Sequence, residues 1–320
     1  MKKLPAMRPP SWVQCAAVLV ILAGMTACQP RPSLAGPALV PAGAKATADF
    51  LPGIENARRI GPRLWSGGEP SGEAAFAALA AHGVRVMVSV DGARPNLEAA
   101  RRHGLRYVHV PIGYEGVPRA AAEELAALAL EREGGVFVHC HHGRHRGPTA
   151  AAIMVMASGA WDGSTANAWQ HAAGTSPEYA GLYRSVRDFA QPDPRTLRSA
   201  ARRLRSYRPP TGLVASMVAV DHHAEALDAM QRNGWKPVAS RPDETPVQAA
   251  RLLREQFAES IRLGHGPDAP RFREAMERLE HGVAAMEGML RAGDMAPATS
   301  AWRALREDCR SCHRAWRDGR

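Results

Sequence analysis

The sequence predicts an α/β domain, with a central sheet flanked by helices, followed by an all-α four-helix bundle. From about residue 60, short β-branched runs alternate with helical stretches, which is the pattern of an α/β fold. After the proline-rich segment 191–194, strand signals stop and apolar residues recur at steps of three and four, which favours helices alone. The length of 320 residues suits two domains of ordinary size.

The elements of the α/β part follow from local patterns. Ser71 with Glu73 is a capping pair that opens an alanine-rich helix. The apolar run at 84–90 suits a buried strand, and the strand at 136–139 ends directly before Cys140. The expected strands are 62–65, 84–90, 106–110 and 136–139, and the expected helices are 71–82, 96–103, 118–131, 147–158, 164–173 and 178–190.

The C-terminal part is expected to be a bundle entered through a basic connecting helix at 195–206. Four amphipathic helices with short loops are typical of such a fold. The expected bundle helices are 213–233, 247–263, 270–291 and 298–318. In the third, one apolar face is formed by residues at helical spacing: Phe272, Ala275, Leu279, Val283, Met286 and Leu290.

Composition and charge narrow the class of protein. With 45% hydrophobic and 22% charged residues, the chain is of the packed globular class and neither disordered nor fibrous. The formal net charge of +10 favours a phosphate-bearing substrate or an anionic membrane surface, or reflects a basic solvated surface. No nucleic-acid partner is expected, because the sequence has no basic stripe interleaved with aromatic residues.

The N-terminus has the pattern of an export signal. Lys2, Lys3 and Arg8 precede an apolar run at 13–25, which is shorter than the roughly 20 residues that span a bilayer. The run ends in Gly-Met-Thr-Ala-Cys28, which resembles the lipobox of bacterial lipoproteins. The resemblance implies lipid attachment at Cys28 and a location on the periplasmic side of a bacterial membrane. Ordinary cleavage before Cys28, releasing a soluble secreted form, is the alternative.

These observations divide the chain into five segments. Of the five cysteines, Cys15 lies in the removable segment, so that besides Cys28 only Cys140, Cys309 and Cys312 remain, each within a motif of its own. No cysteine is left for a disulfide framework. The expected segments are a signal peptide at 1–28, a flexible tether at 29–49, the α/β domain at 50–192, a linker at 193–212 and the four-helix bundle at 213–320.

The run at 139–147 contains a Cys-x5-Arg spacing between a predicted strand and a predicted helix. A short loop at a helix N-terminus directs backbone N–H groups into one cavity, which suits a tetrahedral anion. Arg146 adds a planar fork of donors for two phosphate oxygens. The same positive field favours the thiolate form of Cys140, the nucleophile, and Gly143 allows the tight backbone path.

The motif His139-Cys140-x2-Gly143-x2-Arg146 is similar to that of the protein tyrosine and dual-specificity phosphatases. The resemblance implies a cysteine-phosphatase-type central sheet and hydrolysis of a phosphate monoester. Cys140 would attack phosphorus, and water would hydrolyse the phosphocysteine intermediate. The substrate would be a phosphorylated protein, a lipid phosphate or a small phosphate ester. His139 would orient the loop, and the other loop residues would contact the substrate: His141, His142, Arg144, His145 and Gly147.

Two departures from the family pattern leave catalysis open. Gly147 stands where the family has serine or threonine, and Thr149 is the nearest hydroxyl. The family's acidic loop corresponds to residues 110–118, where Glu115 is the candidate general acid and Asp91, after another strand, is the second candidate. The alternatives are phosphate binding without turnover, a metal site made by the loop imidazoles, and a buried structural Cys140 in an accidental match.

Near the C-terminus, Cys309-Arg-Ser-Cys312-His313 is the CxxCH pattern of covalent c-type haem. The two cysteines would add to the haem vinyl groups and His313 would ligate the iron. A redox-active cysteine pair and half of a zinc site are the alternatives. Export supports haem, because it is attached to such motifs outside the cytoplasm. Trp302, Leu305, Cys309, Cys312 and Trp316 step by three and four along the inward side of the last helix.

The placement of this motif in a final bundle helix is similar to cytochromes of the c-prime type. The resemblance implies that the first bundle helix faces the haem, with Met217 as sixth iron ligand. Alternatively, Met217 is a core residue and the open iron position binds small gases; His222 and His223 are weaker candidates.

The two motifs together predict an exported, lipid-anchored phosphatase with a fused haem c domain. The alternative is a haem protein for electron transfer or gas and redox sensing, with a redox partner, whose phosphatase-like domain binds anions without turnover. Control of Cys140 oxidation by the haem would connect the two parts, because a thiolate is easily oxidised.

Overall fold

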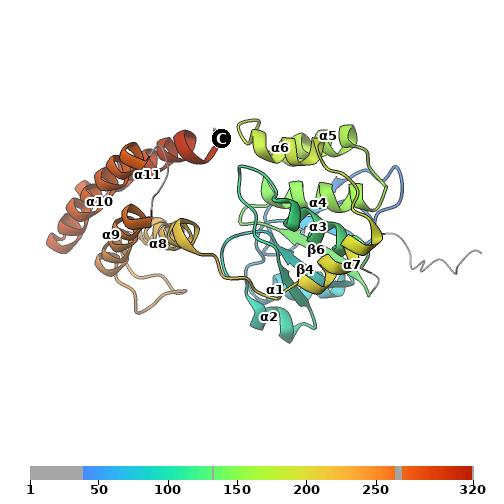
Figure 1. Cartoon of the computed structure of the whole chain (residues 1–320). Coiled ribbons are helices and arrows are strands. Elements are labelled where there is room, and N and C mark those ends of the chain that lie inside the picture. The colour runs from blue at the N-terminus through green and yellow to red at the C-terminus, as the bar shows by residue number, and fades with distance from the viewer. Residues whose placement is uncertain (1–38, 132, 264–268, 319–320) are drawn as a thin grey trace, which may run out of the picture. The chain divides into compact units, whose positions relative to one another are not determined.

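The computed structural model describes residues 39–131, 133–263 and 269–318 (Figure 1). The predicted signal peptide, the lipid site Cys28 and the first part of the predicted tether lie outside the described residues. Within the described ranges, no helix combines the length and the apolar composition needed to cross a membrane.

A mixed six-stranded sheet is the centre of the α/β domain, in the order β1-β2-β3-β6-β4-β5. Strands β3, β6, β4 and β5 are parallel, and the short strands β1 and β2 add to one edge in antiparallel orientation. The carboxyl ends of the four parallel strands therefore meet at one edge of the sheet. The strands are β1 (Thr47–Ala48), β2 (Arg58–Arg59), β3 (Leu64–Gly67), β4 (Val84–Ser89), β5 (Arg106–His109) and β6 (Gly135–His139).

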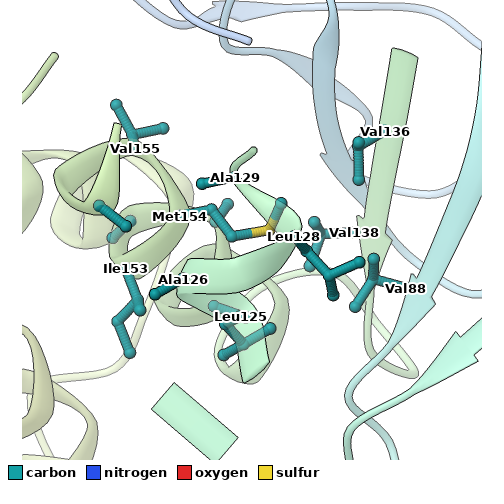
Figure 2. Close-up of a cluster of buried hydrophobic side chains, with 14 of the residues drawn as sticks. Val88, Leu125, Ala126, Leu128, Ala129, Val136, Val138, Ile153, Met154 and Val155 are labelled. Atoms are coloured by element: carbon teal, nitrogen blue, oxygen red, sulfur yellow. The ribbon is translucent and has the colours of Figure 1, made fainter. Parts of the chain in front are cut away.

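Helices cover both faces of this sheet. Side chains alternate along each strand, so each strand contributes apolar residues to the core on either face. Val138 packs into the core under α3 and α4, whereas its neighbour Phe137 packs into the core under α1 and α2. Figure 2 shows Val88 and Val138 against Leu125 and Leu128 of α3. The helices are α1 (Glu73–Ala81), α2 (Leu97–Arg102), α3 (Arg119–Leu128), α4 (Arg146–Ala157), α5 (Gly163–Ala173), α6 (Ala180–Arg187) and α7 (Pro194–Arg203).

The segment predicted as a free tether is packed from Leu39 onward. Leu39 and Val40 are each 1% exposed and belong to the core on the α4 side of the sheet. The Ala44 carbonyl accepts a hydrogen bond from Trp161 Nε1 at 3.1 Å, and β1 pairs with β2. The tether prediction is therefore wrong for residues 39–48. The Pro, Ala and Gly content indicated irregular backbone correctly, but two apolar residues suffice to anchor it.

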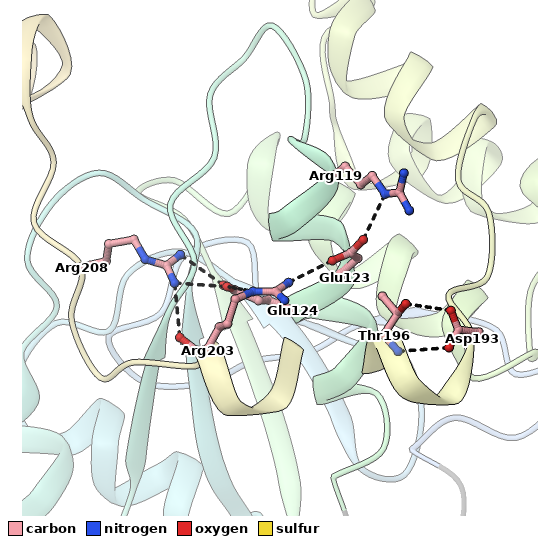
Figure 3. A network of polar contacts seen from close by, with 7 residues as sticks. All are labelled: Arg119, Glu123, Glu124, Asp193, Thr196, Arg203 and Arg208. Atoms are coloured by element: carbon pink, nitrogen blue, oxygen red, sulfur yellow. Dashed lines mark hydrogen bonds and ion pairs between the residues drawn. The ribbon is translucent and has the colours of Figure 1, made fainter. Parts of the chain in front are cut away.

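The predicted linker is also fastened to the α/β domain over most of its length. Helix α7 begins with the capping residue Asp193 and packs against α3. Two carboxylates of α3, the half-buried Glu123 and the buried Glu124, then bind arginines from the end of α7 and from the segment after it (Figure 3). Arg203 lies 2.9 Å from Glu123, and Arg208 lies 3.1 Å from Glu124, whose side chain is 3% exposed. Residues 193–208 are thus part of the α/β domain.

The C-terminal helices share a second hydrophobic core, which contains the apolar face predicted for the third of them except Ala275, which is buried outside this cluster. In sequence order each helix packs on the next. A Cβ at Gly282 would lie 2.7 Å from Leu305 Cδ2, so this glycine lets α10 and α11 approach closely. The helices are α8 (Gly212–Arg232), α9 (Pro246–Leu263), α10 (Ala269–Ala292) and α11 (Met295–His313), followed by a π-helical turn (Arg314–Asp318). The predicted fold class, α/β followed by helices, is confirmed.

Candidate active site

Cys140 lies directly after an inner strand of the sheet. It follows β6, which lies between β3 and β4, and helix α4 begins at Arg146. In parallel sheets, ligands bind beyond the carboxyl ends of the strands, where these loops meet. The Cys140 residue is 3% exposed, so its thiol lies at the bottom of the loop and not on the surface.

The loop between Cys140 and Arg146 is held in one conformation by its surroundings. At Gly143 the backbone is left-handed, with φ of 71°, and a Cβ there would lie 2.3 Å from Gly68 N, so only glycine fits. Partners outside the loop bind its carbonyl oxygens. Glu69 N–H donates to His141 O at 2.9 Å, Asn56 Nδ2 donates to His142 O at 2.7 Å, and Thr175 Oγ1 donates to Arg144 O at 2.9 Å.

Arg146 is buried among groups that fix its guanidinium. Its Nη2 lies 2.5 Å from Asp91 Oδ2, and its guanidinium carbon lies 4.7 Å from the ring centroid of Tyr114. Its Nε is buried and has no hydrogen-bond partner among the described residues. Leaving a buried donor unsatisfied is costly, so this N–H suits an incoming anion.

Asp91 lies in the site, but as a carboxylate. Its Oδ2 also accepts from the backbone N–H of His141 at 3.0 Å, and its Oδ1 accepts from Ala93 N–H at 3.0 Å. Burial opposes ionisation, but the charge of Arg146 and these hydrogen bonds prevail and lower the pKa of Asp91 to about 2. Near neutral pH, Asp91 therefore has no proton to give, and the role of general acid does not fit it in this arrangement.

Glu115 lies on the loop after β5, with its side chain exposed. A Cβ at Gly113 would lie 2.2 Å from its carboxylate oxygens, so the side chain folds back over Gly113. The residue of this loop that contacts Arg146 is the neighbouring Tyr114. Burial raises the pKa of Tyr114, so its phenol stays protonated. Sequence reasoning missed Tyr114, although its position beside the predicted acid was a usable signal.

The position directly after Arg146, where the phosphatase pattern has serine or threonine, is Gly147 and carries no hydroxyl group. A Cβ at Gly147 would lie 3.5 Å from Cys140 Sγ, so a serine there would stand beside the sulfur. Thr149 does not replace it. Its buried Oγ1 donates to His145 O at 2.9 Å and accepts from Gln170 Nε2 at 2.8 Å. Cys140 thus lacks the neighbouring side-chain hydroxyl expected from the phosphatase pattern.

The loop histidines have separate environments. His139 is 1% exposed, its Nε2 lies 3.1 Å from Tyr107 Oη, and burial lowers its pKa. Burial, followed by the charge of Arg146, lowers the pKa of His145 to about 4. His141 is half-buried, and His142 and Arg144 are exposed. Among the described residues, no group of three or more potential metal ligands contains two of the loop imidazoles.

The helical part presents the CxxCH motif on α11. Cys309 and Cys312 are free, half-buried thiols that pack against the second core. Burial raises the pKa of both, and that of Cys312 to about 11. They are therefore neutral thiols near pH 7. Within the described ranges, neither belongs to a group of three or more potential metal ligands.

The packing around these cysteines fits a large apolar group. Along α8, Leu227 and Met230 are fully buried, whereas Met217 and Val220 are only half-buried against the same core. Along α11, Trp302 is likewise buried, whereas the two cysteines are not. Met217 is thus half-buried, as either a sixth iron ligand or a partly covered apolar residue would be, and the donor set Cys309, Cys312 and His313 fits haem c.

Comparisons with known proteins give similarity to solved structures over about half of the chain. No protein-family model matches the sequence, and no curated protein matches it significantly. Among solved structures, P. aeruginosa TpbA is 26% identical, with a TM-score of 0.41, over 49% of this chain and 96% of its own. Human DUSP28 is 20% identical, with a TM-score of 0.31, over 44% of this chain and 97% of its own.

TpbA has also been solved in complex with phosphotyrosine, in a structure that is 23% identical over 50% of this chain, with a TM-score of 0.41. The TpbA and DUSP28 structures are each matched over most of their own length, whereas about half of this chain is covered.

Proposed function

We propose that the protein is a cysteine-dependent phosphatase that hydrolyses phosphate monoesters. The observation that carries the proposal is the five-residue loop between Cys140, which follows β6, and Arg146, which begins α4. In this loop the Arg146 Nε is buried and has no hydrogen-bond partner among the described residues. A substrate phosphate in this loop would supply the acceptor that Nε lacks.

The reaction has two steps. The Cys140 thiolate attacks phosphorus, a P–S bond forms, and the P–O bond to the alcohol or phenol breaks. The leaving oxygen takes a proton from a general acid, for which Glu115, on the loop after β5, is the remaining candidate from the sequence. A water molecule then attacks phosphorus, gives one proton to the Glu115 carboxylate left by the first step, and the P–S bond breaks. Inorganic phosphate leaves and the Cys140 thiolate is restored.

The test is hydrolysis of an aryl phosphate by the mature full-length chain and by Cys140→Ser. The proposal expects turnover by the wild-type protein, a phosphorylated peptide containing Cys140 after acid quenching, and loss of both in the variant. Glu98→Gln, a change at an exposed carboxylate of α2, is the control that keeps full activity. Equal rates with and without the Cys140 sulfur would refute the proposal.

We further propose that α11 carries haem c, bound through Cys309 and Cys312, with His313 as axial ligand. The half-buried thiols beside the half-buried apolar residues of α8 support it. When bound, the haem would supply one-electron or gas-binding chemistry. The chain should be produced with a haem-maturation system. The expected result is a haem that stays with the denatured chain and is lost in the variant Cys309→Ser with Cys312→Ser.

The proposed location is the periplasmic side of a bacterial membrane, with lipid on Cys28 and a soluble secreted form as alternative. The pattern of charge, apolar run and cysteine in the N-terminal segment supports it. Incorporation of labelled fatty acid by the wild-type chain, and its loss in Cys28→Ala, is the expected result. A soluble periplasmic product without lipid would favour the alternative.

A second candidate is a haem protein for electron transfer or gas sensing whose α/β domain binds anions without turnover. Two observations favour it: Gly147 offers no hydroxyl beside Cys140, and the Thr149 hydroxyl is engaged elsewhere. One preparation with a haem spectrum, measurable phosphate affinity and no hydrolysis would support this candidate over the phosphatase.

A further inference from the structure

One carboxylate oxygen contacts two donors of the phosphate loop. Asp91 Oδ2 accepts from the backbone N–H of His141 at 3.0 Å and from Arg146 Nη2 at 2.5 Å. These donors stand at opposite ends of the loop, directly after Cys140 and at its final arginine. We propose that Asp91 is an internal ligand of this loop, which holds two phosphate donors in the free protein and competes with phosphate for them.

The inference rests on the proposed function, because it concerns the same loop. A carboxylate oxygen and a phosphate oxygen accept from the same donors with similar geometry. The His141 N–H has a single hydrogen to donate. A phosphate oxygen that takes this N–H therefore displaces Asp91 Oδ2 from it.

Asp91 is held in position by its own segment. It follows β4, its Oδ1 accepts from Ala93 N–H at 3.0 Å, and its carbonyl oxygen lies 2.7 Å from His109 Nε2. His109 is itself fixed, because its Nδ1 accepts from Arg208 N–H at 3.0 Å. Oδ1 is thus bound to the local turn, whereas Oδ2 is bound to the loop, which makes Oδ2 the atom that an incoming ligand would replace.

Repulsion between the negative charges of Asp91 and phosphate adds to their competition for the same donors. The side chains of Asp91 and Arg146 are only 13% and 12% exposed, so water screens them poorly. A phosphate dianion at the same donors would stand within a few ångströms of the Asp91 carboxylate, and like charges at that distance repel strongly. Asp91 therefore lowers the affinity of the free loop for phosphate and favours release of the product.

Arg146 does not depend on Asp91 alone for its position. Tyr114 lies over its guanidinium at 4.7 Å, and Arg146 begins helix α4. The loop carbonyl oxygens keep their separate partners Glu69, Asn56 and Thr175. Replacing the Asp91 carboxylate with a neutral group of the same shape should leave the loop formed and its two donors free.

The experiment is calorimetric titration of inorganic phosphate into the mature full-length chain at pH 7 and constant ionic strength. The proteins are wild type, Asp91→Asn, and Asp91→Ser, whose hydroxyl can still accept from Ala93 N–H. Glu98→Gln is the control, since it makes the same change in net charge at a side chain that is 87% exposed. The inference expects the Kd for phosphate to fall about tenfold or more in both Asp91 variants, and to stay within about twofold in the control.

The outcomes separate this inference from the proposed function. Equal or weaker phosphate binding by both folded Asp91 variants, with binding retained by the wild type, would overturn the inference and make Asp91 an anchor for Arg146. Tightening in Glu98→Gln to the same extent would also overturn it, because the effect would then be one of net charge. Absence of phosphate binding in every protein would overturn the proposed phosphate site and the inference with it.

Discussion

The Tyr114 ring covers the guanidinium of Arg146, with 4.7 Å between the ring centroid and the guanidinium carbon. The contact joins the loop after β5 to the first residue of α4. A cation over an aromatic face in a partly dry site is stabilised by about 0.5 to 2 kcal/mol. It also leaves the edge of the guanidinium, and with it Nε, available to an anion.

Replacing Tyr114 with alanine should therefore loosen Arg146. We expect KM for a phosphate ester to rise by about 2- to 30-fold, the equivalent of the lost cation–π contact. Tyr114→Phe keeps the ring and should stay close to wild type. Steady-state kinetics of the three proteins checks this, and a Phe variant as impaired as the Ala variant would assign the effect to the hydroxyl instead.

Replacing Glu115 with glutamine tests the general acid. Protonation of the leaving oxygen by a positioned acid contributes about 10²- to 10⁴-fold. Glu115→Gln should reduce kcat by that order for alkyl phosphates and much less for a nitrophenyl phosphate, whose leaving group needs no proton. A uniform loss across both substrates would contradict the assignment. Glu98→Gln, at the surface of α2, controls for the change in net charge.

Replacing Gly147 with serine should improve turnover. A Cβ at this position lies 3.5 Å from Cys140 Sγ, so the serine hydroxyl can donate to the thiolate. A hydrogen bond to a charged group contributes about 1.5 to 3 kcal/mol, and we expect kcat to rise about tenfold. Gly147→Ala adds the same Cβ, 3.2 Å from Cys140 N, without a hydroxyl. Gains of the same size in both variants would show that the hydroxyl is not the cause.

Replacing Gly143 with alanine should destroy the phosphate loop. The new Cβ would lie 2.3 Å from backbone atoms of Gly67 and Gly68, in a left-handed conformation that by itself costs alanine about 1 to 2 kcal/mol. We expect lost phosphate binding and a Tm lower by several degrees. Gly163→Ala is the matched control, because its nearest neighbour would be Met156 Cε at 4.0 Å. A Gly143→Ala protein that binds phosphate normally would contradict the loop conformation.

The stability of the protein should depend on pH through His145. Burial, followed by the charge of Arg146, holds its pKa at about 4, below the ordinary 6.5. Between these values the unfolded chain binds the proton and the folded chain does not, so stability falls as the pH is lowered from 6.5 toward 4. His145→Gln should flatten this part of the Tm profile. His281→Gln, at an exposed residue of α10, should leave the slope unchanged.

The sequence predicted those parts of the fold and site that depend on local pattern. The strand, loop and helix around Cys140 and Arg146 combine a β-branched run, a fixed spacing and an alanine-rich stretch within about twenty residues. The strands β1 and β2 were not predicted, because two residues carry no periodicity. The packing of Leu39 and Val40 was missed for a similar reason, since a two-residue apolar anchor is not a pattern.

The contacts that determine the protonation state of Asp91 could not be predicted from local sequence patterns. Asp91 and Arg146 are separated by 55 positions, and only the order of the strands brings them together. The same holds for His109 and Arg208, which are 99 positions apart. From the sequence alone, a carboxyl group after a strand can equally be a general acid or an ion-pair partner. Its protonation state depends on its burial and its neighbours, which only the folded chain determines.

The close approach of α10 and α11 at Gly282 has a consequence for the chemistry of α11. Leu305 fits against a residue without a side chain, so the two helices cannot slide or rotate past each other without a clash. Cys309 and Cys312 lie one and two turns beyond Leu305 on the same helix. This contact would set their orientation before the proposed haem binds. The chain would then meet the haem as a preorganised acceptor, and a side chain introduced at position 282 would disturb attachment without touching the haem.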